Sequence, residues 1–268
     1  MIMQRALGII SSCLKGMREE DTLDFISEAG FTSFFSSERA TDMQSVTNIR
    51  KRADSLGLRY EFLHAPFQGI NAMWEDGEAT RLFLRAILDS IDSASENGVP
   101  AIIMHVSSGW NPPPINDTGL NRFDQIVEYG EKRGVIIAFE NLRKLGNHAY
   151  LMQRYENSPF VAYCFDNGHE HCYTETVPYL DLFGKKLLCT HIHDNFGRPA
   201  DDNINGDLHL LPFDGNYDFK KMIRKMDEYG YAGTLMLETG NWNERYASLS
   251  PKEFLKTAYE RIEKISKL

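Results

Sequence analysis

The sequence predicts one closed barrel of eight parallel strands, a (β/α)8 TIM barrel, as a single domain over residues 1–268. Apolar strand-like runs alternate with amphipathic helical stretches along the chain, which is typical of a parallel sheet. Eight such units fit within a length that one α/β barrel normally occupies. A doubly wound sheet is the alternative, but no glycine-rich GxGxxG turn follows the first apolar run.

The predicted strands are almost continuously apolar, as expected when both faces of a strand are covered. The first four runs are "LGIISSC" (7–13), "FTSFFSS" (31–37), "RYEFLHAPF" (59–67) and "AIIMHVSSG" (101–109). The last four runs are "VIIAFENL" (135–142), "FVAYCFDNGH" (160–169), "KLLCTHIHDN" (186–195) and "AGTLMLETG" (232–240). A helical stretch follows each run, and many of these stretches stop at glycine, as in "EAG", "SLG" and "KRG".

Composition and charge limit the classes of function. The chain is 42% hydrophobic and 25% charged, as in ordinary soluble globular proteins, and its formal net charge is −9. An acidic chain repels phosphate backbones, which disfavours a nucleic-acid partner. No apolar run reaches the length of a membrane span, so no membrane partner is expected. The four cysteines form no CxxC pair, and a reducing, cytoplasmic location is the simplest interpretation.

Ionisable residues gather where the predicted strands end. Six histidines lie at or just beyond these ends: His64, His105, His169, His191, His193 and His209. Four carboxylates join them: Glu140, Asp166, Asp207 and Glu238. In a barrel these strand ends meet at one face, where active sites are built, so we expect one common site. The two remaining histidines, at positions 148 and 171, are expected on the surface.

So many ionisable groups on one rim would be unstable without a compensating cation. Mixed carboxylate and imidazole ligands suit Mn²⁺, Zn²⁺, Co²⁺ or Fe²⁺. In "LLCTHIHDN" alternate side chains share a face, so His191 and His193 should both point into the barrel mouth and Ile192 toward the helices. Asp194 would then begin a loop, and we expect it to hold a ligand histidine by a hydrogen bond.

At these residues the chain resembles the xylose isomerase-like TIM barrel superfamily, which joins sugar and sugar-phosphate isomerases and epimerases to the apurinic endonuclease IV group. The resemblance implies a set of ligands for one divalent metal ion: Glu140, Asp166, His191 and Glu238. It implies that Glu140 and Glu238 are also the catalytic acid and base. Five histidines are the expected substrate-binding residues: His64, His105, His169, His193 and His209. Members of this superfamily are often dimers or tetramers, so a homo-oligomer is expected.

The favoured function is a metal-dependent isomerase or epimerase that moves a proton on a small sugar, sugar phosphate or related polyol or keto compound through an enediolate. The alternative is a zinc phosphodiesterase of the endonuclease IV type with two or three zinc ions. That alternative would add five ligands: His64, His105, His169, Asp207 and His209. The acidic charge and the lack of a basic stripe in the loops argue against a DNA substrate. A metal-binding barrel without catalytic activity is a third interpretation.

Two loops are expected to select the substrate: residues 66–78 and the long loop after the seventh strand. Three aromatic side chains could form an apolar wall there or simply pack the loops: Phe67, Trp74 and Trp110. If the substrate is phosphorylated, three basic residues could meet the phosphate: Arg143, Lys144 and Arg198. For each basic residue, a solvated surface charge is the competing interpretation.

Overall fold

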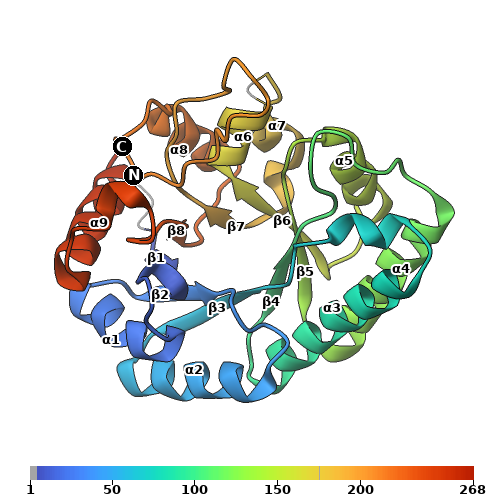
Figure 1. Ribbon diagram of the computed structural model, residues 1–268, viewed down its shortest axis with the longest axis horizontal. Helices are drawn as coiled ribbons and strands as arrows, with labels where there is room; N and C mark the ends of the chain where they lie inside the picture. The colour runs from blue at the N-terminus through green and yellow to red at the C-terminus, as the bar shows by residue number, and fades with distance from the viewer. Residues whose placement is uncertain (1–4, 175) are drawn as a thin grey trace.

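A computed structural model describes residues 5–174 and 176–268 of the chain; residues 1–4 of the expected domain, and residue 175, lie outside the described part. Eight strands form the centre of the molecule and the helices surround them (Figure 1). The first four strands are β1 (Leu7–Ile10), β2 (Ser33–Ser36), β3 (Arg59–His64) and β4 (Ala101–Met104). The last four are β5 (Ile136–Glu140), β6 (Val161–Asp166), β7 (Leu187–His191) and β8 (Leu235–Leu237). Each lies within its predicted run.

The helices follow the strands in the predicted alternation. The first five are α1 (Glu19–Ala29), α2 (Met43–Leu56), α3 (Glu78–Glu96), α4 (Asp117–Arg133) and α5 (Leu145–Arg154). The remaining four are α6 (Asn167–Tyr173), α7 (Tyr179–Phe183), α8 (Phe219–Glu228) and α9 (Pro251–Ser266). Gly57 and Gly134 end α2 and α4 in the left-handed conformation, with φ of 70° at both. This conformation favours glycine, which explains the predicted stop positions.

The sheet runs in the order β7-β6-β5-β4-β3-β2-β1-β8, and every ladder is parallel. The barrel closes between β7 and β8 through a bridge from Ile192 to Leu237. There the Ile192 amide donates to the Met236 carbonyl at 2.8 Å. The Thr190 hydroxyl supplements this short seam by donating to the Thr234 carbonyl at 3.1 Å. The predicted TIM barrel is confirmed, with its least extensive pairing at the β7–β8 seam.

Packed apolar side chains fill the interior of the barrel and the layer between the strands and the helices. Phe34, Phe35, Phe139 and Phe165 are fully buried. Burying each such side chain contributes about 1.5–3 kcal/mol of transfer free energy. Buried ionisable residues lie at the carboxyl ends of β3, β5, β6 and β7, so the apolar core supports a polar mouth at this end of the barrel.

His148 corrects the expectation of a surface residue. Its side chain is fully buried on α5, with Nε2 3.3 Å from the Phe139 carbonyl oxygen and aromatic rings around it. The helical pattern explains this placement, since His148 shares a face with the buried Leu151 and Met152. Burial lowers the pKa of His148 to about 4, so its ring is neutral at neutral pH. His171 is half-buried and contacts Asn216.

Within the described ranges, none of the helices combines the length and the apolar character required to cross a membrane.

Candidate metal centre and active site

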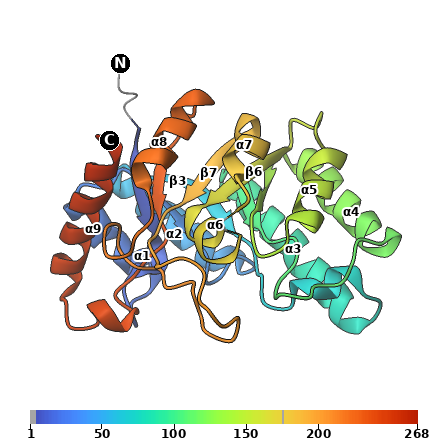
Figure 2. The ribbon, with the colours of Figure 1, turned by 90° about the horizontal axis from the view of Figure 1, so that it is seen from above.

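The predicted site residues meet at the carboxyl ends of the strands. Strands β3, β5, β6 and β7 end directly in site residues: His64, Glu140, Asp166 and His191. His105 follows β4 and Glu238 follows β8, while His169 lies in α6. Asp207 and His209 come from the loop between β7 and α8, which lies over this end of the barrel (Figure 2). Because all the strands run in the same direction, their carboxyl ends bring together residues that are up to 174 positions apart in sequence.

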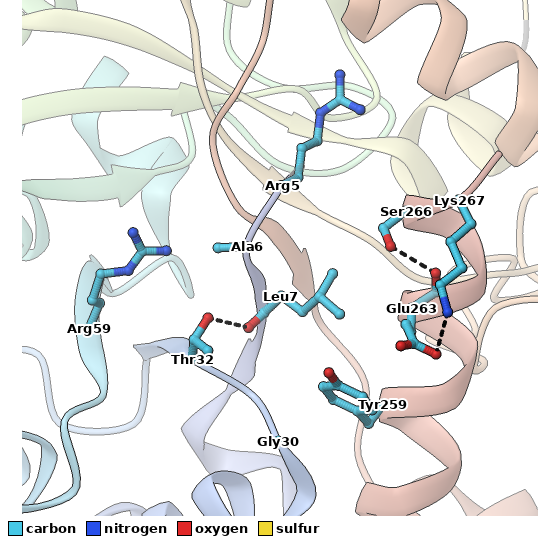
Figure 3. Close-up of a pocket in the computed structure, with 10 residues that line it drawn as sticks. All are labelled: Arg5, Ala6, Leu7, Gly30, Thr32, Arg59, Tyr259, Glu263, Ser266 and Lys267. Carbon is cyan, nitrogen blue, oxygen red and sulfur yellow. Dashed lines mark hydrogen bonds and ion pairs between the residues drawn. The ribbon is translucent and has the colours of Figure 1, made fainter. Parts of the chain in front are cut away.

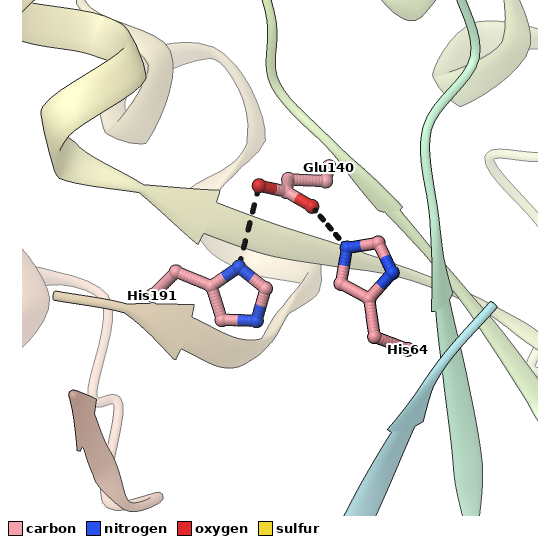
Figure 4. Close-up of side chains that lie close together, drawn as sticks. All are labelled: His64, Glu140 and His191. Carbon is pink, nitrogen blue, oxygen red and sulfur yellow. Dashed lines mark hydrogen bonds and ion pairs between the residues drawn. The ribbon is translucent and has the colours of Figure 1, made fainter. Parts of the chain in front are cut away.

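Glu140 lies at the centre of the site, and its two carboxylate oxygens face different histidines (Figure 4). Its Oε2 is 3.1 Å from Nε2 of both His64 and His105. Its Oε1 is 3.2 Å from Nδ1 of His169 and 3.3 Å from Nδ1 of His191. The carboxylate is almost completely buried, so these histidines are its main polar surroundings.

A group of four possible metal ligands lies at the carboxyl ends of β5, β6, β7 and β8. Glu140, Asp166, His191 and Glu238 each offer a donor atom, and all four atoms lie within 4.8 Å of one another. His191 Nδ1 is 3.4 Å from Glu238 Oε2 and 3.9 Å from Asp166 Oδ2. These four residues are the ones that the family resemblance singled out as metal ligands, and their spacing suits one small divalent cation.

A third group extends the cluster toward the loop after β7. His169 Nε2 and His209 Nε2 lie 3.2 and 3.3 Å from the same oxygen of Asp207. His193 Nε2 is 3.3 Å from Asp166 Oδ1, and its ring stacks on His209 with centroids 4.1 Å apart. His191 and His193 thus both face the barrel mouth, as the alternation along "THIHD" predicts.

The close carboxylates and imidazoles shift one another's pKa values. Burial alone raises the pKa of Glu140, but His191 and His105 outweigh it and hold the pKa well below its ordinary value. Burial lowers the pKa of His191, but Glu238 and Glu140 raise it to about 10. His209 likewise has its pKa lowered by burial and raised to about 10 by Asp207. Without a metal ion, protonated histidines therefore balance the buried carboxylates, and a divalent cation would serve the same purpose.

Several donor atoms in the cluster fit a metal ion. Within residues 5–174 and 176–268, buried Asp166 Oδ2, His193 Nε2 and Asp207 Oδ1 have no hydrogen-bond partner. Unpaired buried polar atoms are costly, and they are commonly explained by an ion or by bound water. Oxygen and imidazole nitrogen donors suit Zn²⁺, Mn²⁺, Co²⁺ or Fe²⁺. The residues present therefore fit the metal ion that the family resemblance implies.

Short hydrogen bonds explain the "DNGH" motif at the end of β6. Asp166 Oδ1 accepts from the backbone N–H of His169, so this aspartate caps α6 and fixes the position of His169. Gly168 lies between them, and a Cβ there would come within 1.9 Å of His193 Cε1. The motif therefore needs glycine at this position so that the His193 ring can lie against the backbone.

Two asparagines that the sequence interpretation missed hold the strand ends. Asn141 donates to the Asp166 carbonyl at 2.8 Å and accepts from the Asp166 N–H at 2.9 Å. Asn167 makes the same pair of contacts with the His193 backbone, at 2.9 and 3.1 Å. Each asparagine directly follows a candidate metal ligand, in "EN" and "DN", and that adjacency is the signal that could have revealed them.

Asp194 corrects another expectation, because its carboxylate contacts no ligand histidine. It accepts four backbone N–H groups instead: those of Asn195, Phe213, Gly215 and Tyr217, at 2.9 to 3.1 Å. Since Asp207 and His209 lie between these positions, Asp194 ties down both ends of the loop that carries them.

The aromatic residues near the mouth divide into two groups. Trp74 is 2% exposed and donates to the Val106 carbonyl, so it packs the loops and forms no part of a substrate wall. Phe67 is 43% exposed, with its ring 4.9 Å from the His105 ring and 5.5 Å from the His64 ring. Trp242, 37% exposed and 5.7 Å from the His209 ring, stands on the other side.

A cavity of about 670 Å³ lies at the opposite end of the barrel (Figure 3). It is lined by the start of β1, Thr32, Arg59 and the last turns of α9. No histidine and none of the predicted site residues reaches it. The cavity lies at the amino ends of the strands, whereas TIM-barrel active sites form at the carboxyl ends, so we do not assign it to the active site.

Fold and site geometry together define the class of protein. The chain belongs to the xylose isomerase-like TIM barrel family, whose model matches residues 23–260.

Relatives and solved structures agree with this membership. The chain is 30% identical over 258 residues to the uncharacterized protein y4fM of Sinorhizobium fredii. The match covers 81% of this chain and 80% of the relative. Its fold is similar to D-psicose 3-epimerase with D-tagatose from Clostridium cellulolyticum H10, with a TM-score of 0.76, 12% identity and 98% of each chain covered. A D-tagatose 3-epimerase-like protein gives a TM-score of 0.71 at 24% identity, covering 97% of this chain and 98% of that one.

Proposed function

We propose that this protein is a metal-dependent isomerase or epimerase that acts on a small sugar or a related polyol or keto compound. The observation that carries the proposal is a set of four donor residues at the carboxyl ends of adjacent strands, three of them buried and Glu238 partly exposed: Glu140, Asp166, His191 and Glu238. The family membership and the epimerases among the structures of similar fold support the reaction class.

In an epimerase a proton leaves one carbon and returns to the same carbon from the other face, whereas in an isomerase it returns to the neighbouring carbon. When bound, a divalent metal ion supplies Lewis-acid polarisation of the carbonyl and the adjacent hydroxyl group. Glu140 and Glu238 both reach the space around His191 Nδ1, at 3.3 and 3.4 Å. One carboxylate would remove the proton to give the enediolate, and the other would return a proton from the opposite direction.

The histidines around this pair have the right chemistry to bind hydroxyl groups. His64 donates from Nδ1 to the Ala65 carbonyl at 2.7 Å, and this fixes its tautomer so that Nε2 faces Glu140. His105, His169, His193 and His209 line the remaining sides of the mouth. Phe67 and Trp242 would supply apolar faces for the C–H groups of the sugar.

Metal content and proton exchange test this proposal together. We expect elemental analysis of protein purified without chelator or added metal to give about one Mn, Zn, Co or Fe per chain. We then expect NMR to show solvent deuterium entering the carbon next to the carbonyl of an accepted ketose. Protein that is loaded with metal and exchanges no deuterium into a broad panel of ketoses and keto acids would contradict the proposal.

One observation favours a second candidate, a multinuclear zinc phosphodiesterase. Glu140 presents Oε2 to His64 and His105 and Oε1 to His169 and His191, so it could bridge two metal ions. Asp207 and His209 add donors beside His169. Two or three zinc ions per chain, with hydrolysis of a phosphodiester such as bis(p-nitrophenyl) phosphate, would place this candidate first.

A further inference from the structure

Arg143 occupies an unusual position beside the candidate metal centre. It lies three residues after Glu140, in the loop between β5 and α5, and is half-buried. Its guanidinium carbon is 3.8 Å from the ring centroid of Tyr173 and 5.6 Å from that of Trp110. Its Nη2 also donates to the Tyr173 hydroxyl at 2.7 Å. Two aromatic side chains therefore hold the cation in one orientation.

Arg143 has no anionic partner among residues 5–174 and 176–268. Among the described residues it forms no ion pair with a carboxylate, and its buried Nε lacks a hydrogen-bond partner. Several other arginines have such partners: Arg154 contacts Asp124 at 2.6 Å, and Arg198 contacts Asp202 at 3.0 Å. Aromatic rings compensate only part of the cost of removing a cation from water. The position therefore suits an anion that the described part of the chain does not supply.

A cavity of about 200 Å³ opens beside this arginine. Arg143, Trp110, Tyr173 and the loop after β7 line it. The loop contributes Gly206 and also Asp202, whose charge is paired with Arg198 at 3.0 Å. The Tyr173 ring stacks on the His169 ring with centroids 5.3 Å apart. Tyr173 therefore lines the cavity and contacts a candidate ligand at the same time, so the cavity adjoins the cluster.

We propose that Arg143 and the Tyr173 hydroxyl bind the phosphate of a phosphorylated sugar, which makes Arg143 a specificity-determining residue. This inference rests on the proposed function and names its substrate class. Because the Tyr173 oxygen accepts from Arg143, its own O–H is free to donate to a phosphate oxygen. The guanidinium of Arg143 also lines the cavity and is the second donor, since guanidinium groups match phosphate geometry well. A phosphate monoester carries about two charges and three terminal oxygens, enough for both donors.

Binding of inorganic phosphate tests the site without any turnover. The protein is first treated with chelator, so that phosphate cannot bind through a metal ion, and is then titrated by calorimetry. We expect Arg143→Gln to weaken phosphate binding at least tenfold, since a charge-assisted hydrogen bond is lost. Lys144→Gln is the matched control, because it removes the neighbouring positive charge, and its residue does not line the cavity. Arg143→Lys should restore part of the binding if the charge is what matters.

Turnover then tests the substrate class. With metal-loaded protein, we expect a higher kcat/KM for a ketohexose 6-phosphate than for the same ketohexose, and Arg143→Gln should remove most of that preference. Arg143-dependent phosphate binding with no exchange on any sugar would leave the anion site in place and would refute the proposed reaction. The phosphate assignment is wrong if wild-type protein binds no phosphate, if Arg143→Gln binds it as well as wild type, or if a sugar carboxylate is preferred to the sugar phosphate.

Discussion

Replacing Asp194 by asparagine should loosen the loop that carries Asp207 and His209. The carboxylate of Asp194 accepts two backbone N–H groups on each oxygen: Asn195 and Tyr217 on Oδ1, Phe213 and Gly215 on Oδ2. An asparagine has the same shape, but one of its two polar atoms is an NH2 group. That group is a donor, and it would face two N–H donors.

The geometry sets the size of the effect. Two of the four hydrogen bonds would be lost, and each is a bond to a charged acceptor worth about 1.5–3 kcal/mol. Asp194 is 1% exposed, so water cannot replace the lost partners. We therefore expect Asp194→Asn to lower the free energy of unfolding by about 3–6 kcal/mol. The loop between residues 195 and 217 should also exchange its amide hydrogens faster.

Urea unfolding and hydrogen exchange of the purified variants measure these effects. Asp201→Asn is the matched control, because Asp201 lies exposed in the same loop and its carboxylate accepts from Asn203, two positions later. That control should change the free energy of unfolding by less than about 0.5 kcal/mol. A loss below about 1 kcal/mol for Asp194→Asn, or unchanged exchange in the loop, would show that the four bonds do not hold it.

Three further predictions concern single side chains. Glu238→Gln should lower turnover at least about 100-fold with the circular dichroism spectrum unchanged, because it removes a ligand and an acid/base group; retained activity would refute that assignment. His209→Ala should lower kcat/KM by no more than about tenfold if one metal is used, whereas a loss of activity together with loss of bound zinc would support the phosphodiesterase. His148 is neutral in the folded protein, with its pKa lowered from 6.5 to about 4, so the unfolded chain takes up a proton first as pH falls. The contribution of the neutral His148 ring to the free energy of unfolding is complete above pH 6.5, and it should fall by about 3 kcal/mol as the pH is lowered toward 4. Urea unfolding of His148→Leu should show a smaller loss of stability over this pH range. An equal pH dependence in both proteins would count against the neutral ring.

Much of the fold can be predicted from the sequence because its signal is local. Each strand lies inside a predicted apolar run, and glycines such as Gly57 and Gly134 mark helix ends by their left-handed conformation. The convergence of Glu140 and Glu238 also follows from the sequence, because parallel strands place their carboxyl ends on one face.

Long-range contacts explain what the sequence could not predict. Asp194 lies beside two histidines, yet its partners are backbone N–H groups up to 23 positions later in the chain. Trp74 directly precedes the polar residues Glu75 and Asp76, yet it is buried against Gly119 and Phe123 of α4. The burial of His148 is different, because it follows from a local pattern: His148, Leu151 and Met152 share one buried face of α5.

The β7–β8 seam has a mechanical consequence. A bridge at Ile192 holds these two strands together, and His191 and Glu238 stand on either side of it. An ion bound by both side chains would act as a cross-link across the least extensively paired joint of the barrel. Binding of the ion would then raise the free energy of unfolding by RT ln(1 + [metal]/Kd). Chelation should allow the barrel to begin opening at this joint, so the amide hydrogens of Ile192 and Glu238 would be the first among the strand ends to exchange.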